Sequence, residues 1–143
     1  MADGHPGKHE ERPAGAPIAS DPARHVALVQ GIFYVATGVW PLVSLRTFEA
    51  VTGPKTDKWL VKTVGALIGV VGAALLAEAR RPTVSPAGKL VGAGSALALA
   101  AVDVVYTSRG RISKVYLLDA AVELGIAGAW LLSTARRPGG LPS

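Results

Sequence analysis

The chain alternates between four long apolar stretches and short polar segments. The apolar stretches cover about residues 26–45, 59–77, 88–106 and 115–132. Each is close to the roughly 20 residues that a helix needs to cross the hydrocarbon core of a bilayer. The polar segments between them are short and contain Gly or Pro, which is typical of turns. The pattern predicts an all-α protein, a four-transmembrane-helix antiparallel bundle.

The two ends of the chain differ in composition from this membrane domain. Residues 1–23 mix charged residues with Gly, Ala and Pro and lack hydrophobic periodicity, and residues 138–143 read PGGLPS. Segments of this kind cannot bury enough apolar surface to fold alone. We therefore expect a disordered N-terminal tail, a membrane domain over residues 24–137, and a disordered C-terminal tail.

Composition agrees with a membrane class. The chain is 50% hydrophobic and 17% charged, whereas soluble domains carry about 25% charged residues. Its 15 Lys and Arg residues lie mainly between the apolar stretches, as loop charges do in membrane proteins, so nucleic-acid binding is not expected. The chain has no Cys, which excludes a disulfide framework, a thiolate metal site and a cysteine nucleophile.

Three carboxylates interrupt the apolar stretches: Asp103 in the third, and Asp119 and Glu123 in the fourth. Asp119 and Glu123 are four residues apart, which places them on one face of a helix. A carboxylate at membrane depth costs free energy, and such residues often mark ion or substrate paths. The up-and-down topology brings the ends of the first and third helices to the same side. We therefore predict a polar acidic cavity in one membrane half, rimmed by Lys and Arg.

The predicted ligand-binding residues are Asp103, Asp119, Glu123, Tyr106, Tyr116, Tyr34 and Lys62. Lys62 lies one turn inside the second stretch, where its ammonium group either reaches the interface, the preferred interpretation, or turns toward a carboxylate. A purely structural interpretation stays open, in which the acids pair with Lys62, Arg109 or Arg111 and fix the helix register. No catalytic residue, metal site or cofactor is predicted.

The segment 46–58, RTFEAVTGPKTDK, is the most characteristic loop. Phe48 and Val51 predict a short interfacial helical turn, and Gly53-Pro54 ends it. The Gly-Pro-Lys sequence lacks the second glycine and the Lys-Ser/Thr pair of a phosphate-binding loop, so it is interpreted as a turn.

Two segments carry a resemblance to known proteins. Residues 51–73, VTGPKTDKWLVKTVGALIGVVGA, and residues 108–125, SRGRISKVYLLDAAVELG, together with Asp103, resemble a group of small four-helix bacterial integral membrane proteins of unknown function. The likeness covers about residues 24–137 and implies a membrane setting but no catalytic residue. The general shape is also similar to that of DoxX-like proteins and of sterol-isomerase-type four-helix folds.

Three classes of function remain. We favour an accessory or binding module that holds a lipophilic or cationic small molecule or joins a larger membrane complex. A proton-coupled exporter similar to the small multidrug transporters is the second hypothesis, although those carry their key glutamate in the first span, where this chain has no acid. A lipid-modifying intramembrane enzyme that uses Asp and Glu as acid and base ranks last, because no nucleophile or cofactor loop accompanies them.

Location and assembly follow from the same features. We expect a multi-pass protein of the inner (cytoplasmic) membrane. The basic residues are nearly balanced between the two sides, and the hydrophilic N-terminal tail favours both termini in the cytoplasm. The small-residue faces of the second and third stretches also allow a homodimer.

Overall fold

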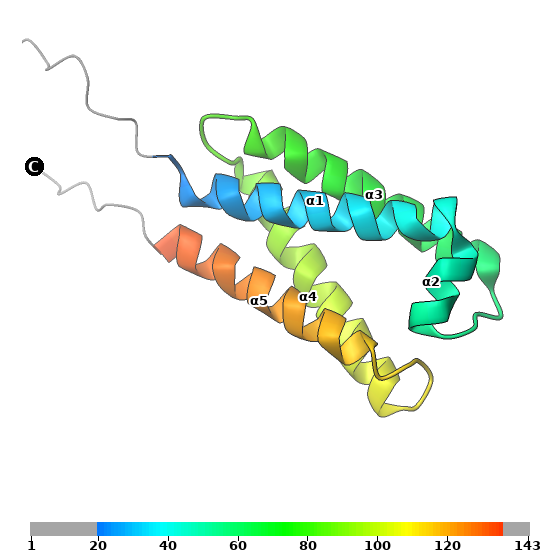
Figure 1. Cartoon of the computed structure of the whole chain (residues 1–143). Coiled ribbons are helices and arrows are strands. Elements are labelled where there is room, and N and C mark those ends of the chain that lie inside the picture. Colours follow the sequence, from blue (N-terminus) through cyan, green and yellow to red (C-terminus); the bar gives the residue numbers. More distant parts are fainter. Residues whose placement is uncertain (1–19, 136–143) are drawn as a thin grey trace, which may run out of the picture.

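A computed structural model describes residues 20–135, which form five helices and short connections. The helices are α1 (Pro22–Val43), α2 (Leu45–Thr52), α3 (Lys58–Ala79), α4 (Pro86–Ser108) and α5 (Tyr116–Ala135). The four long helices run antiparallel in chain order, so α1 begins and α5 ends at the same end of the bundle (Figure 1). The predicted all-α, four-helix antiparallel bundle is confirmed. We refer to the opposite end, with α2 and the segments 53–57 and 109–115, as the α2 end.

The long helices extend slightly beyond the predicted apolar stretches because polar caps precede them. Asp21 precedes α1, and its Oδ1 accepts a hydrogen bond of 3.0 Å from the backbone N–H of Ala23. Ser85 caps α4 in the same way, accepting from the N–H of Gly88 at 3.0 Å. Both helices then start with proline, which suits the first helical position. The predicted tails lie mostly outside the described residues.

The outer surface of the bundle is apolar. Large side chains on the long helices are widely exposed, for example Leu90 (74%), Leu118 (70%) and Leu131 (70%). Aliphatic exposure on this scale is unfavourable in water and is normal for side chains that face lipid. All four long helices are also long and apolar enough to span a bilayer. The chain is therefore a multi-pass membrane protein.

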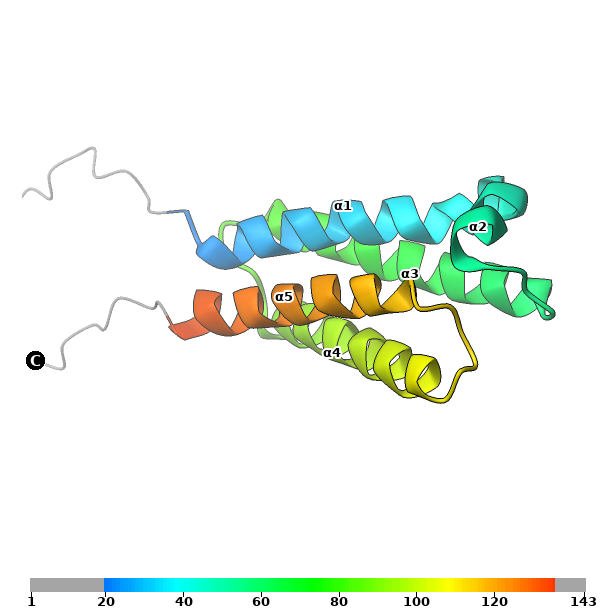
Figure 2. The same cartoon turned by 60° about the horizontal axis from the view of Figure 1, so that its bottom comes forward.

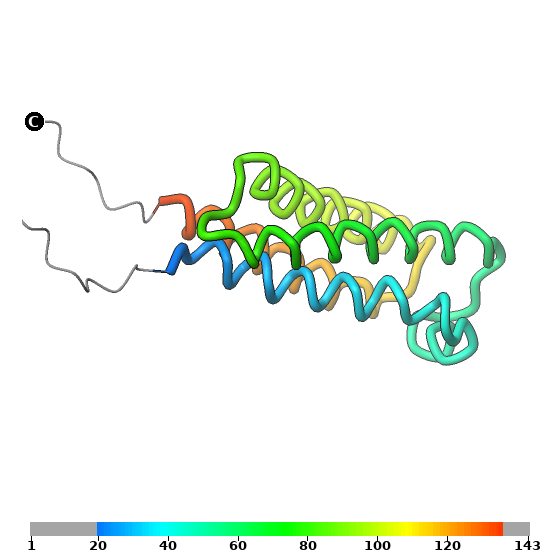
Figure 3. The backbone as a smooth tube through the Cα atoms, turned by 90° about the horizontal axis from the view of Figure 1, so that it is seen from above, coloured from blue at the N-terminus to red at the C-terminus, as the bar shows by residue number. Residues whose placement is uncertain are grey.

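The bundle consists of two helix pairs, α1 with α3 and α4 with α5, which lie one above the other in Figure 2. Figure 3 shows α1 and α3 side by side over most of their length. Glycines permit this close approach: a Cβ atom at Gly72 of α3 would lie 2.7 Å from the backbone nitrogen of Val35 and 2.8 Å from the carbonyl oxygen of Gly31. Gly65 and Gly72 of α3 thus form a helix-packing face within the bundle.

A buried polar network joins α1, α4 and α5 in the half of the bundle away from α2. Trp130 Nε1 donates to Gln30 Oε1 at 2.7 Å, and Gln30 Nε2 donates to the carbonyl oxygen of Gly92 at 2.8 Å. Gln30 is 0% exposed and Trp130 is 2% exposed. Their side-chain groups are satisfied within the protein, so this half of the bundle is closed and structural.

The predicted short helical turn is confirmed as α2. Phe48 packs edge-on against Trp40 at the end of α1, with ring centroids 5.6 Å apart. α2 ends at Gly53, whose φ of +87° is in the region that favours glycine. This turn sends residues 54–57 back toward the bundle and places Lys55 beside α5, with its Nζ 4.8 Å from the ring centroid of Tyr116.

Candidate functional site

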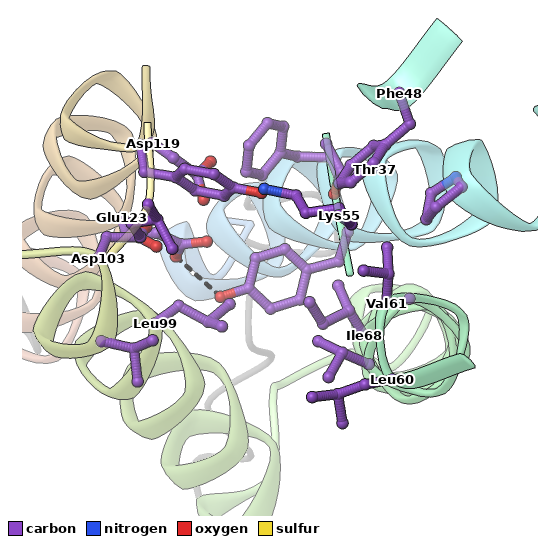
Figure 4. Close-up of a pocket in the computed structure, with 18 residues that line it drawn as sticks. Thr37, Phe48, Lys55, Leu60, Val61, Ile68, Leu99, Asp103, Asp119 and Glu123 are labelled. Atoms are coloured by element: carbon purple, nitrogen blue, oxygen red, sulfur yellow. Dashed lines mark hydrogen bonds between the residues drawn. The ribbon is translucent and has the colours of Figure 1, made fainter. Parts of the chain in front are cut away.

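A pocket of about 330 Å³ lies between the two helix pairs, in the half of the bundle nearest the α2 end (Figure 4). This volume is at the lower end of the range for small-molecule sites. All five helices or their connections contribute to its wall. Its apolar lining consists of Phe33, Pro41, Phe48, Leu60, Val61, Val64, Gly65, Ile68, Leu99, Val102 and Ile112.

Three carboxyl groups gather on one side of this pocket (Figure 4). Asp119 and Glu123 come from α5, where they share a helix face with Tyr116 because the spacing is three and then four residues. Asp103 comes from α4, four residues after Leu99 on the same face. Asp103 is 5% exposed and Glu123 is 1% exposed. The pocket is therefore an apolar chamber with one acidic wall.

Hydrogen bonds satisfy this acidic wall only in part. Tyr34 of α1 donates its hydroxyl proton to Glu123 Oε2 at 2.8 Å, which ties α1 to α5. The carboxyl groups of Asp103 and Asp119 face each other across α4 and α5. Asp103 Oδ2 is buried and has no hydrogen-bond partner among the described residues. A proton held between the two Asp residues, or an N–H donor supplied by a ligand, would satisfy this atom.

No basic side chain within residues 20–135 forms an ion pair with these acids. The ion pairs in that part of the chain join Lys58 to Glu49 and Arg81 to Glu78. The structural interpretation had required pairing with Lys62, Arg109 or Arg111, and the described residues show none of these pairs. The same residues contain no group of three His, Asp or Glu side chains arranged to hold a metal ion.

The structure brings most of the predicted site residues together. Tyr34, Asp103, Tyr116, Asp119 and Glu123 all line the pocket. Two predicted members, Lys62 and Tyr106, lie elsewhere.

Lys62 and Tyr106 are outside the pocket lining. Lys62 is exposed on α3, in agreement with the interfacial orientation that was preferred for it. Tyr106 is 44% exposed. The buried face of α4 continues from Asp103 to Thr107, which is four residues later, so Tyr106, three residues after Asp103, lies beside this face. A tyrosine in this position, near the helix end, suits the membrane interface.

Lys55 lines the pocket although the sequence placed it only among the basic residues of the rim. Its position depends on the turn at Gly53 and on Glu49, whose Oε1 accepts a hydrogen bond of 2.9 Å from the backbone N–H of Lys55. The Gly-Pro turn directly before it was the available signal, since such a turn reverses the chain toward the helices it connects.

Comparison with protein-family models, curated proteins and solved structures finds no match for this chain. No residue role is therefore carried over from another protein. The function of the pocket follows from its shape, its apolar lining and its carboxyl groups.

Proposed function

We propose that this protein is a membrane-embedded binding module whose pocket holds a lipophilic cation with N–H donors, such as an alkyl or alicyclic ammonium compound. The observation that carries the proposal is the acidic wall of Asp103, Asp119 and Glu123 in an otherwise apolar pocket. An apolar body suits the lining, and an ammonium group suits the carboxylates.

Charge balance supports this ligand class. Carboxylates removed from water must be neutralised by protons, by protein cations or by a ligand, because an isolated charge in an apolar medium is costly. Among residues 20–135, the ion pairs to Lys or Arg involve Glu49 and Glu78, and none involves the three carboxyl groups of the pocket. An ammonium ligand would supply positive charge together with N–H donors, one of which suits the buried, unpaired Asp103 Oδ2.

A direct test uses 1-adamantylammonium as the probe and the neutral, similarly shaped 1-adamantanol as its control. Equilibrium dialysis against the full-length protein in lipid nanodiscs, with empty nanodiscs as the blank, gives the Kd of each. We expect binding of the ammonium compound above the blank and a Kd at least about tenfold higher in Asp119→Asn and in Glu123→Gln, since a charge-assisted hydrogen bond contributes about 1.5–3 kcal/mol.

The matched control is Glu78→Gln, the same chemical change near the other end of α3. Glu78 accepts a hydrogen bond from the N–H of Ser85 and lines no part of the pocket, so its variant should bind the probe as the parent protein does. Circular dichroism at the assay temperature identifies variants that fail to fold. Equal binding of the ammonium compound and the alcohol, or unchanged Kd in both pocket variants, would contradict the proposal.

The two other functions place different demands on the same acids. An exporter must open the pocket to both sides, and the half away from α2 is filled by the hydrogen-bonded side chains Gln30 and Trp130. An exporter should also confer drug tolerance that disappears in Glu123→Gln. An enzyme should convert a lipid without any partner protein, which mass spectrometry of the nanodisc lipids would detect.

We further propose that the protein lies in the cytoplasmic membrane of a bacterium, with both termini inside and the α2 end outside. Because the chain has no Cys, single Cys variants report the topology without background. A membrane-impermeant maleimide applied to intact cells should label Thr56→Cys, in the exposed turn at the α2 end, and spare Thr83→Cys in the α3–α4 connection. The reverse pattern would overturn this orientation.

A further inference from the structure

A second cleft lies at the α2 end, next to the pocket. It has a volume of about 570 Å³ and is formed by the segments 52–57 and 110–113 at the α2 end. Lys55, Leu60, Val61 and Ile112 line both the cleft and the pocket, so the two spaces adjoin. The cleft therefore gives access to the acidic pocket from the α2 end, and Lys55 lies at the junction of the cleft and the pocket.

The ammonium group of Lys55 has only neutral partners among the described residues. Its Nζ donates to the carbonyl oxygen of Thr52 at 3.1 Å and lies 4.8 Å from the ring centroid of Tyr116. Glu49 of α2 binds this segment, but its carboxylate accepts from the backbone N–H of Lys55 and pairs with Lys58 at 4.0 Å. The side chain of Lys55 is thus held over the pocket without an anionic partner.

Figure 4 shows the ammonium end of Lys55 extending across the pocket toward the side that holds Asp119 and Glu123. The ring over which it lies belongs to Tyr116, one turn before Asp119 on α5. A cation in this position is attracted to the carboxyl groups but is tethered by its own backbone, which Glu49 fixes. The Lys55 ammonium group therefore fills part of the space that a ligand cation would fill, and it partly neutralises the negative potential that would attract such a cation.

We propose that Lys55 is a built-in competitor that determines which cations the pocket accepts. A ligand ammonium entering through the surface cleft displaces the Lys55 side chain from Tyr116 into water and takes its place near the carboxyl groups. Neutral compounds of the same shape gain nothing from this exchange. The inference rests on the proposed cation-binding function and names the residue that sets its selectivity.

The test measures the Kd of 1-adamantylammonium and of 1-adamantanol for Lys55→Met, Lys55→Arg and the parent protein in nanodiscs. Met keeps most of the side-chain length and removes the charge. We expect Lys55→Met to lower the Kd of the ammonium compound about tenfold, because the ligand no longer has to displace an ammonium group that is attracted to the same carboxyl groups. Lys55→Arg should keep the parent Kd within about threefold, and the alcohol should show no gain.

Lys114→Met is the matched control, because Lys114 is exposed at the same end and lines neither the cleft nor the pocket. It removes the same surface charge and should leave the Kd unchanged within about twofold, since exposed charges are screened by salt.

The outcomes separate this inference from the proposed function. If the parent protein and Lys55→Met bind the ammonium compound equally well, Lys55 is no competitor and the cation site stands. If Lys55→Met gains as much affinity for the alcohol as for the ammonium compound, Lys55 only obstructs the pocket sterically. The proposal that Lys55 competes with cations is then wrong. If neither protein binds the ammonium compound above the blank, the cation site itself is wrong, and the inference falls with it.

Discussion

Replacing Gly38 by alanine is expected to lower the stability of the bundle by about 2–3 kcal/mol, because overpacking a tight contact forces the backbones apart. A Cβ atom at Gly38 would lie 2.5 Å from the carbonyl oxygen of Gly65 and 2.6 Å from the backbone nitrogen of Gly69. Both atoms belong to the backbone of α3 and cannot move away as a side chain would. The α1–α3 pair must therefore separate locally, with loss of van der Waals contacts along the interface.

Gly69→Ala is the matched control, on the same interface and with the same added methyl group. A Cβ atom there meets no heavy atom within 4 Å. Alanine also has the higher helix propensity, so Gly69→Ala should be neutral or slightly stabilising. Thermal unfolding in detergent, followed by circular dichroism, should show a Tm lowered by roughly 5–10 °C for Gly38→Ala alone. Equal Tm values for the two variants would show that the helices are not in backbone contact at Gly38.

The comparison of these glycines shows what sequence patterns reveal about helix packing. Gly65 and Gly69 have the GxxxG spacing that predicts a packing face. The α3 glycines at which a side chain would clash with α1, however, are Gly65 and Gly72. Their partners Gly31 and Gly38 on α1 have the same seven-residue spacing and were not recognised. A small residue marks a close approach only in relation to the helix opposite it, and a single sequence does not say which helix that is.

The acidic wall was predictable for a different reason. Asp119 and Glu123 share a face because of the period of one helix, and Asp103 joins them because the up-and-down topology fixes which helix ends meet. The basic side chains were harder to place. Lys55 and Lys62 both lie toward the α2 end, and the sequence does not show which of them reaches the acids. The path of the loop after Gly53, which no helix period predicts, brings Lys55 to the pocket.

Replacing Gln30 by leucine is expected to destabilise the bundle by about 2 kcal/mol, and this is the second large effect. Leucine fills most of the volume of Gln30 but leaves the buried indole N–H of Trp130 without its acceptor. The carbonyl oxygen of Gly92 loses one donor and keeps the hydroxyl of Ser95 as another. Unsatisfied buried groups typically cost 1–3 kcal/mol each, and somewhat less in membrane bundles, where the unfolded state finds other partners.

A double-mutant cycle separates the hydrogen bond from the packing of these two residues. Trp130→Phe removes the donor and some volume. The free energy of unfolding of the double variant Gln30→Leu/Trp130→Phe should be about 1 kcal/mol higher than the sum of the two single effects predicts, because the second change removes the N–H that the first left without an acceptor. Thr63→Val is the control, since Thr63 is exposed and its hydroxyl bonds only to the carbonyl oxygen of Trp59 in its own helix. Its stability should change by less than about 0.5 kcal/mol.

The same cycle tests whether the two halves of the bundle have separate roles. Gln30 and Trp130 line no part of the pocket, whereas Tyr34, one turn after Gln30, donates to Glu123 within it. Gln30→Leu should therefore reduce stability while the folded protein keeps the parent Kd for 1-adamantylammonium within about twofold, since Gln30 contributes nothing to the pocket lining. A tenfold change in Kd would mean that the network orients Tyr34 through α1, and that the half away from α2 contributes to binding as well as to stability.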